Sequence, residues 1–281
     1  MRHRISLQVG PVGFRIGSDW RAPIAALDAL YRDYPRAEFA DYSVRLEATS
    51  FWRRWVRPSV RTTGDYHLPD AAPLPLAQGL LAAEMGMNLQ VALGHRRHLL
   101  LHAAVVARGD RAMLLSGVSG AGKSTLALML SELGWRILGD EFAMIDPATG
   151  WAHPFPRPIS LKNESLSVIP AGRLVGPLLS GTPKGEVRHV APDAAAIAAM
   201  TQPARPALLV FPRFGHPLAL QGMAPTETFV RLTQASTNYV ALGEAGFRTL
   251  TRLRAEVPAV ALDYPDGEAG VAAVESIWSA L

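Results

Sequence analysis

Apolar and polar residues alternate in short runs over roughly the first 70 residues of the chain. Alternation with a period of two predicts β-strands with one buried face, and Gly, Pro and Asp between the runs predict turns. Residues 22–31 show helical spacing instead and carry Pro23 in the first turn, where a helix tolerates it. The expected strands are ISLQVG, VGFRIG, YSVRLEA and SVRTTGDYHL.

A longer helix is expected over residues 73–94, with prolines in its first turn and with internal glycines that weaken it. From residue 98 the run HLLLHAAVVA is almost continuously apolar, which is typical of a buried strand. Arg108, Gly109 and Asp110 predict a hairpin turn, and AMLLS after it predicts a second buried strand.

Strands and helices follow one another in the remainder of the chain. A helix is expected up to about residue 133, where Gly134 ends it. Residues 170–190 are rich in Gly and Pro and predict a mobile loop. Further strands are expected in WRIL, GDEFAMI, ALLVFPRF and VPAVALDY, and further helices at 193–200, 225–235, 241–254 and 268–280.

This order of elements predicts a mixed α/β core preceded by a smaller β-rich lobe. We place the N-terminal lobe at residues 1–95 and the core domain at residues 96–281. With 281 residues, 49% of them hydrophobic and 19% charged, the chain is long and apolar enough for such a globular core.

Composition and charge narrow the functional classes. The absence of cysteine excludes disulfides, cysteine-ligated zinc and cysteine nucleophiles. The net charge of +4 would suit a nucleic-acid surface, but no Lys/Arg run exceeds two residues and no nucleic-acid motif occurs, so we expect no nucleic-acid partner. The N-terminus lacks the apolar segment of a signal peptide, and the longest apolar run, near 99–107, is too short to span a bilayer. We therefore expect a cytoplasmic protein that does not enter a membrane.

Lysine is rare in this chain. The 28 basic residues include only three lysines, Lys123, Lys162 and Lys184. Lysine is a compact point charge, whereas arginine is a broad planar fork, so each lysine is a candidate for a position that arginine cannot serve. Chance use of a lysine codon would explain each position as well.

The segment GVSGAGKS, residues 117–124, fits the phosphate-loop pattern G-x-x-x-x-G-K-[S/T]. Its glycines allow successive backbone N–H groups to point at phosphate oxygens, and the helix that follows offers its N-terminus to the same anion. Lys123 would reach the β- and γ-phosphates, and the Ser124 hydroxyl would bind Mg²⁺. The sequence therefore predicts ATP and Mg²⁺. The expected nucleotide contacts are Gly117, Ser119, Gly120, Ala121, Gly122, Lys123, Ser124 and Thr125.

Two acids lie one helix and one short strand after the loop. Asp140 and Glu141 follow Ser124 by 16 and 17 residues, which allows them to return to the phosphate side. We expect Asp140 to join Ser124 in binding the metal, and either acid to accept a proton from an attacking hydroxyl. His102, in the strand before the loop strand, could orient or share that proton. A plain acidic turn and a core histidine would explain the same residues.

These residues together resemble the HPr kinase/phosphorylase family. The resemblance rests on His102, the segment GVSGAGKST, the helix LALML, Gly134 and the acid pair, and it covers about residues 98–165 well. It implies a phosphate-loop kinase domain of the HPr kinase C-terminal type, with a mixed sheet around the loop. Departures are Glu141 where the family has a second Asp, Thr125 where it has Glu, an unrecognisable second signature and a missing MurF-like N-terminal domain.

The chain looks still more like the HPr kinase-related kinase A group. The shared features are Glu84, Gly86 and Asn88, then LLLHAAVV, WRILGDE and RPISLKNES, and this resemblance extends over nearly the whole chain. It implies a peptide or protein acceptor, a PqqD-like partner and similarity to kinases of lasso-peptide precursors, and HPr kinases form homo-oligomers. It also suggests that Lys162 acts in the active site, where a helix start would be the plainer explanation.

Three further residues are candidates for the phosphate or acceptor side. Lys184 could close over the nucleotide from a mobile loop, and Arg157 and Arg213 could hold phosphate oxygens bidentately. The favoured function is transfer of the ATP γ-phosphoryl group to a hydroxyl, most naturally a serine, of a peptide or protein. A nucleotide-binding regulatory protein without transfer and a small-molecule kinase are the alternatives. We do not extend the family resemblance to HPr as the substrate of this chain or to the reverse phosphorylase reaction.

Overall fold

The computed structural model describes residues 1–68 and 70–281 and divides the chain into two compact units. The first unit comprises Met1–His95 and Ser160–Asp193, and the second comprises Arg96–Ile159 and Ala194–Leu281. The sequence predicts one core domain over residues 96–281. The segment Ser160–Asp193 instead clusters with the first unit, where the Gln78 side chain donates hydrogen bonds to the carbonyls of Ser180 and Gly181.

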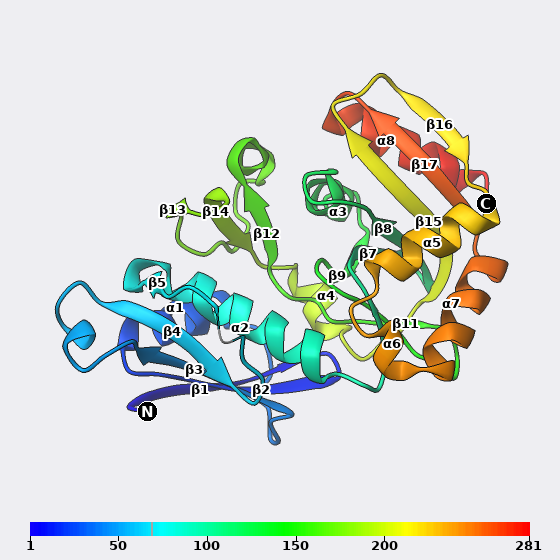
Figure 1. Cartoon of the computed structure of the whole chain (residues 1–281). Helices are drawn as coiled ribbons and strands as arrows, with labels where there is room; N and C mark the ends of the chain where they lie inside the picture. Colours follow the sequence, from blue (N-terminus) through cyan, green and yellow to red (C-terminus); the bar gives the residue numbers. More distant parts are fainter. Residues whose placement is uncertain (69) are drawn as a thin grey trace. The chain divides into compact units, whose positions relative to one another are not determined.

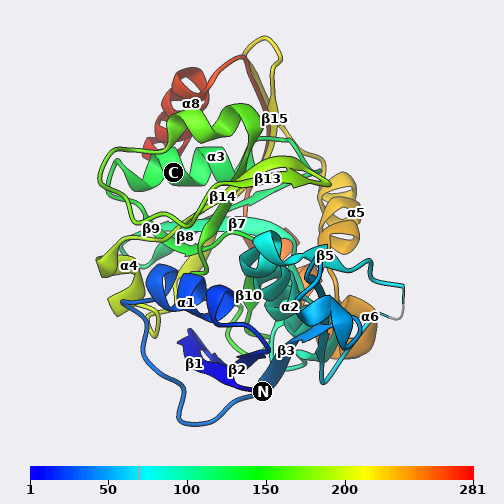
Figure 2. The same cartoon turned by 90° about the vertical axis from the view of Figure 1, so that its left-hand side faces the viewer.

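The first unit is built on a five-stranded sheet in the order β1-β2-β3-β4-β5. All neighbouring strands pair antiparallel except β2 and β3, which are parallel and joined through helix α1 (Arg21–Leu30). Helices α1 and α2 (Gly79–Gly94) pack on each other and against this sheet (Figure 2). The strands are β1 (His3–Val9), β2 (Val12–Ser18), β3 (Tyr42–Ala48), β4 (Ser59–Gly64) and β5 (Leu74–Pro75).

Two expectations for this unit were wrong. The helix expected from residue 73 begins only at Gly79, since the two prolines near its start favour extended backbone in the residue before each, and Leu74–Pro75 forms β5. The loop expected over residues 170–190 contains an antiparallel hairpin, β13 (Leu179–Thr182) and β14 (Gly185–Val190). This hairpin forms a three-stranded sheet with β12 (Ile159–Lys162), which leads into the 3-10 helix Asn163–Val168.

The second unit contains a six-stranded sheet in the order β16-β17-β15-β8-β7-β9. Strands β8, β15 and β17 are mutually parallel, whereas β7 is antiparallel to both of its neighbours, β8 and β9. Two antiparallel steps make β9 parallel to β8. The strands are β7 (Ala103–Arg108), β8 (Arg111–Ser116), β9 (Arg136–Gly139), β15 (Arg205–Phe214), β16 (Ala219–Gly222) and β17 (Ala259–Tyr264).

Helices cover both faces of this sheet. On one face α3 (Lys123–Ser131) packs against α8 (Gly267–Ser279), and the two lie side by side in both views (Figures 1 and 2). On the other face lie α5 (Pro225–Ala235), α6 (Tyr239–Leu242), α7 (Glu244–Glu256) and a small sheet of β6 (Leu99–Leu101), β10 (Ala143–Ile145) and β11 (Ala152–His153). The remaining helix, α4, spans Ala194–Ala198.

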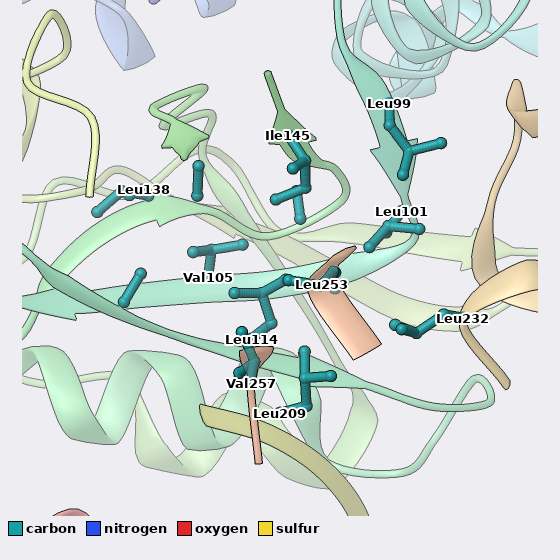
Figure 3. Packing of buried hydrophobic residues seen from close by; sticks show 14 of the residues in the cluster. Leu99, Leu101, Val105, Leu114, Leu138, Ile145, Leu209, Leu232, Leu253 and Val257 are labelled. Atoms are coloured by element: carbon teal, nitrogen blue, oxygen red, sulfur yellow. The ribbon is translucent and has the colours of Figure 1, made fainter. Parts of the chain in front are cut away.

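The apolar core of the second unit fills the space between the six-stranded sheet and this second layer (Figure 3). Alternate residues of the strands, such as Val105, Leu114 and Leu209, meet Leu232 of α5 and Leu253 of α7. Alternation along the strands therefore sends every second side chain to this layer and the others toward α3 and α8.

Further expectations were corrected in this unit. The run expected as one strand from residue 98 breaks at His102, where the chain leaves the small sheet as β6 and enters the large one as β7. Continuous apolar character could not reveal that break, because both strands are fully buried. The helix expected over 241–254 is divided by Gly243, whose φ is +55°. The fold is thus mixed α/β, and none of the described helices is long and apolar enough to cross a membrane.

Candidate active site at the carboxyl edge of the six-stranded sheet

The carboxyl ends of parallel strands meet at one edge of the six-stranded sheet, and most of the candidate residues gather there. The glycine-rich loop, residues 117–122, follows β8, and Asp140 and Glu141 follow β9. His102 lies at the same edge because β7, which runs in the opposite direction, begins directly after it. In open α/β sheets this edge is where ligands bind.

The glycine-rich loop turns sharply before α3. Gly120 and Gly122 have φ angles of +85° and +91°, in the region that glycine adopts without a steric penalty. A β-carbon at Gly122 would lie 2.0 Å from the hydroxyl oxygen of Tyr264, whereas one at Gly120 would meet no described atom within 4 Å. That Tyr264 hydroxyl donates a hydrogen bond of 3.3 Å to the carbonyl of Ala121, and burial raises its pKa to about 12. Gly122 is therefore required by both its backbone angle and its close neighbour.

Lys123 is the first residue of α3 and is buried, with 7% of its surface exposed. Its Nζ donates to the carbonyl oxygens of Gly117 at 2.7 Å and Val118 at 3.0 Å, so the ammonium group lies against the loop. Gly122, which precedes the helix, has no side chain to cap it, and the N-terminus of a helix attracts anions. Ser124 and Thr125 occupy the same first turn and are half-buried.

The histidine and the acids form the other side of the site. His102 Nδ1 lies 3.7 Å from Glu141 Oε2, which is an ion-pair separation when the histidine is protonated. Both side chains remain partly open to solvent, at 43% and 32% exposure, whereas Asp140 is buried at 4%. Backbone bonds fix His102, since its N–H donates to Ala235 at 2.7 Å. A buried acid beside an open acid–histidine pair is an arrangement that can bind a cation and accept a proton.

A cavity of about 850 Å³ opens beside the loop. It extends from His102 and the loop across the ends of β15, β16 and β17 to α5. Two arginines line it, and each is already paired. Arg213 donates Nε to Asp263 Oδ1 at 2.9 Å and also bonds Oδ2, and Arg231 donates to Glu227 at 2.7 Å.

These pairs define the electrostatics of the cavity. The hydrogen bonds from Arg213 hold the pKa of Asp263 below its usual value, and the same bonds raise the pKa of Arg213. The Arg231 guanidinium also lies 5.3 Å from the Phe211 ring centroid. Guanidinium groups keep further donors after one bidentate pair, so both arginines can still contact a bound anion.

Two candidate residues belong to the other unit. Lys162 ends β12, where its backbone N–H donates to Ser165 Oγ at 2.8 Å, and Lys184 lies in the turn of the β13–β14 hairpin. Asn163, with a φ of +52°, donates to the Lys184 carbonyl at 3.2 Å and accepts from the Glu186 N–H at 3.1 Å. Lys162 therefore ends one strand of the three-stranded sheet and Lys184 lies in the hairpin turn of the same sheet, and their suggested roles in catalysis stay predictions.

Arg157 lies in the second unit, but it is 3% exposed and its guanidinium lies 5.9 Å from the Phe155 ring centroid. Sequence reasoning missed Tyr264, Asp263 and Arg231. The first two end the expected strand VPAVALDY, so strand-end position was the signal that could have found them. Arg231 lies on an amphipathic helix, and no sequence signal distinguished it.

The residues suited to a metal are few. Among residues 1–68 and 70–281, no group of three or more His, Asp or Glu side chains is arranged to hold an ion. A hydroxyl from Ser124 and a carboxylate from Asp140 are nevertheless the hard oxygen ligands that Mg²⁺ prefers when phosphates and water supply the remainder. No known family model matches the chain, and a search of curated proteins finds no significant similarity.

Proposed function

We propose that the second unit is a phosphate-loop kinase domain that binds ATP and Mg²⁺ at residues 117–125. The proposal rests on the buried Lys123 at the start of α3. Its ammonium group donates hydrogen bonds to two carbonyl oxygens of the glycine-rich loop. A buried ammonium at the N-terminus of a helix is suited to a polyphosphate, which supplies the negative charge that the loop lacks.

In the proposed phosphoryl transfer, different residues bind the phosphates, bind the metal and accept the proton. Loop N–H groups and Lys123 hold the β- and γ-phosphates, and Ser124 and Asp140 would hold Mg²⁺, which neutralises phosphate charge when bound. The acceptor hydroxyl oxygen forms a bond to the γ-phosphorus as the bond to the β–γ bridging oxygen breaks and ADP leaves. Glu141 accepts the hydroxyl proton, and His102, 3.7 Å away, stabilises or relays it.

We further propose that the acceptor is a serine or another hydroxyl of a peptide or protein. The resemblance to HPr kinase-related proteins supports this acceptor, the HPr kinase type of fold, a PqqD-like partner and a homo-oligomer. The 850 Å³ cavity beside the loop supports a substrate site, since it lies within the 300–1,000 Å³ that ligand sites typically occupy.

The test is labelling of a library of serine-containing peptides with γ-labelled ATP, together with calorimetric measurement of ATP-Mg²⁺ binding. Wild type should bind ATP and label a subset of peptides, and Lys123→Ala should lower transfer by about 10³-fold, because one phosphate-binding charge is lost in the transition state. Arg248→Ala, which removes one exposed positive charge from α7 of the same unit, serves as the control for the loss of a single charge.

Each outcome separates one function from the others. ATP binding without transfer to any peptide or small hydroxyl compound identifies a regulatory nucleotide binder, which the departure at Glu141 favours. Transfer to a small hydroxyl compound alone identifies a small-molecule kinase. Absence of ATP binding, or equal labelling by wild type and Lys123→Ala, would overturn the proposal.

A further inference from the structure

The connection between β3 and β4 exposes an unusual cluster of apolar side chains. Phe51, Trp52, Trp55 and Val56 have 70%, 71%, 61% and 62% of their surface exposed. All four lie within residues 51–57, which we name the aromatic–arginine loop, in the first unit (Figure 1). Single exposed apolar residues are ordinary, but a contiguous group of large ones marks an interaction surface.

The aromatic–arginine loop is held in one shape. The Phe51 ring stands edge-on to Trp52 at 5.5 Å and to Trp55 at 5.0 Å, and Trp52–Arg54 form a 3-10 turn. The indole N–H of Trp20 donates to the Arg54 carbonyl at 2.9 Å and ties the turn to the end of β2. A rigid surface loses little conformational entropy when it binds.

The loop ends in a strained backbone. Arg57 has a φ of +45°, in the left-handed region that a non-glycine residue seldom adopts. Arg53 Nη1 donates to the Arg57 carbonyl at 3.3 Å, which closes the turn. Strain of this kind costs about 1–3 kcal/mol and persists where the surrounding structure enforces it, often at binding sites.

The charge around the aromatic side chains is positive. Arg53, Arg54 and Arg57 lie within the loop, and residues 48–64 contain no acidic residue. Asp19 lies 3.4 Å from the Arg54 guanidinium and forms an ion pair with it. This ion pair does not include Arg53 or Arg57. The whole chain carries +4, which adds a long-range attraction to anionic surfaces.

We propose that the aromatic–arginine loop docks on an anionic lipid surface. Tryptophan favours the headgroup level of a bilayer, and arginines near an anionic leaflet add attraction. A protein partner would normally contact about 20–30 residues, far more than this seven-residue loop, whereas a headgroup layer accepts a few side chains without matching their shape. The docking is peripheral and independent of the kinase proposal, because none of its residues belongs to the second unit.

Cosedimentation of the full chain with vesicles tests this proposal. The vesicles are phosphatidylcholine alone or phosphatidylcholine with about 30% phosphatidylserine, at low and high salt. Four proteins are compared: wild type, Trp52→Ala/Trp55→Ala, Arg53→Gln/Arg57→Gln and the control Phe39→Ala. Phe39 is an 84% exposed aromatic residue of the same unit that lies outside the aromatic–arginine loop. Only one arginine, Arg36, lies within three residues of it in the sequence.

Wild type and Phe39→Ala should bind the anionic vesicles and release them at high salt. The double tryptophan variant keeps the net charge, so a fall of about tenfold or more in its partition coefficient would assign binding to the aromatic rings. The double arginine variant should lose most of the preference for anionic vesicles, because two positive charges of the loop are removed. Circular dichroism and the melting temperature verify that each variant is folded.

Three results would overturn the proposal. The first is equal vesicle binding by wild type and the double tryptophan variant, and the second is no preference of wild type for anionic lipid. The third is a change of molecular mass in solution caused by the tryptophan substitutions without any vesicle binding, which would make the loop a contact between copies of the chain.

Discussion

The carboxyl and amino ends of the six-stranded sheet are formed by the same strands but differ in the surroundings of their charged side chains. At the carboxyl end the strands lead into the glycine-rich loop, the His102–Glu141 pair and a cavity. At the amino end four strands carry arginine as a first or last residue, and the guanidinium groups of Arg108, Arg111 and Arg136 contact other parts of the protein. The four arginines are Arg108, Arg111, Arg136 and Arg205.

The amino end shows how structural charges are arranged. Arg108 donates to both carboxylate oxygens of Glu275 at 2.9 and 2.8 Å, and the Trp135 indole donates to the same carboxylate at 2.6 Å. Arg136 donates to the carbonyls of Ala199 and Gln202 at 3.1 and 2.8 Å. Short, bidentate contacts of this kind fix a side chain in one position.

The carboxyl end also holds tight pairs, such as Arg213 with Asp263, but it carries in addition an open acid–histidine pair and exposed loop residues. The His102–Glu141 separation of 3.7 Å exceeds a hydrogen bond, and the loop carries exposed residues such as Val118, at 79% exposure. Arginines that contact only the protein at one end, and a cavity beside the glycine-rich loop at the other, are what the proposed function requires. Substitutions of the same type at the two ends test whether only the carboxyl end contributes to phosphoryl transfer.

The largest difference is expected for carboxylate-to-amide changes. Asp140→Asn should lower phosphoryl transfer by about 100-fold or more, because it removes a charge that the proposed metal site uses. Glu275→Gln, at the other end, should leave transfer unchanged. Transfer rates measured over a range of Mg²⁺ concentrations test this role of Asp140. Equal rates for Asp140→Asn and wild type would show that its carboxylate is not part of the metal site.

The next effect concerns the two glycines of the loop. Gly122→Ala should destabilise the unit by about 3 kcal/mol, because the left-handed backbone costs about 1 kcal/mol and the contact with Tyr264 adds strain. Gly120→Ala should cost only about 1 kcal/mol, since its β-carbon meets open space. Denaturant unfolding measures both. Equal losses would show that the close approach to Tyr264 does not constrain the loop.

A smaller effect, on stability alone, is expected at the amino end. The hydrogen bonds from Arg108, with that of Trp135, hold the pKa of Glu275 below its ordinary value. A lowered carboxyl pKa stabilises the fold above the unfolded pKa near 4.5, and this stability is lost as the pH falls through the folded value. Glu275→Gln should therefore cost about 1 kcal/mol at neutral pH, a figure discounted because the pair is partly exposed.

The pH dependence of unfolding provides the check on Glu275. The difference in unfolding free energy between wild type and Glu275→Gln should shrink as the pH is lowered from 6 toward 3, a range of about three units around the carboxyl values. A difference that stays constant over this range would mean that the charge of Glu275 contributes nothing to the fold.

The sequence predicted the elements around the carboxyl edge well for physical reasons that can be named. The loop glycines and the apolar run of β8 are local signals, and the acids after β9 follow from the order of elements. Periodicity could not separate β6 from β7 at His102, because both strands are buried on both faces. Long-range contacts, such as that of Tyr264 with the loop, are also outside the reach of local patterns.

The assignment of segments to units was equally beyond local patterns. The segment Ser160–Asp193 contains a Gly- and Pro-rich stretch, but this composition did not indicate which unit the segment joins. Gln78 of the first unit donates to the carbonyls of Ser180 and Gly181 at 3.1 Å. Two of the three lysines thus fall in the first unit, and their rarity alone could not tell which of them joins the loop.

Tyr264→Phe should have the smallest effect alone and a revealing one in combination. Removing the hydroxyl eliminates a 3.3 Å bond to the Ala121 carbonyl, which should cost about 1 kcal/mol or less because the bond is long. In Gly122→Ala the same removal takes away the atom that the new methyl group meets at 2.0 Å, so it should stabilise the variant. The left-handed strain at residue 122 would remain, and recovery should be partial. A double-mutant cycle in denaturant measures this change of sign. Additive losses in the cycle would mean that the loop avoids Tyr264 by moving, and that its shape is less fixed than the contacts at the carboxyl edge imply.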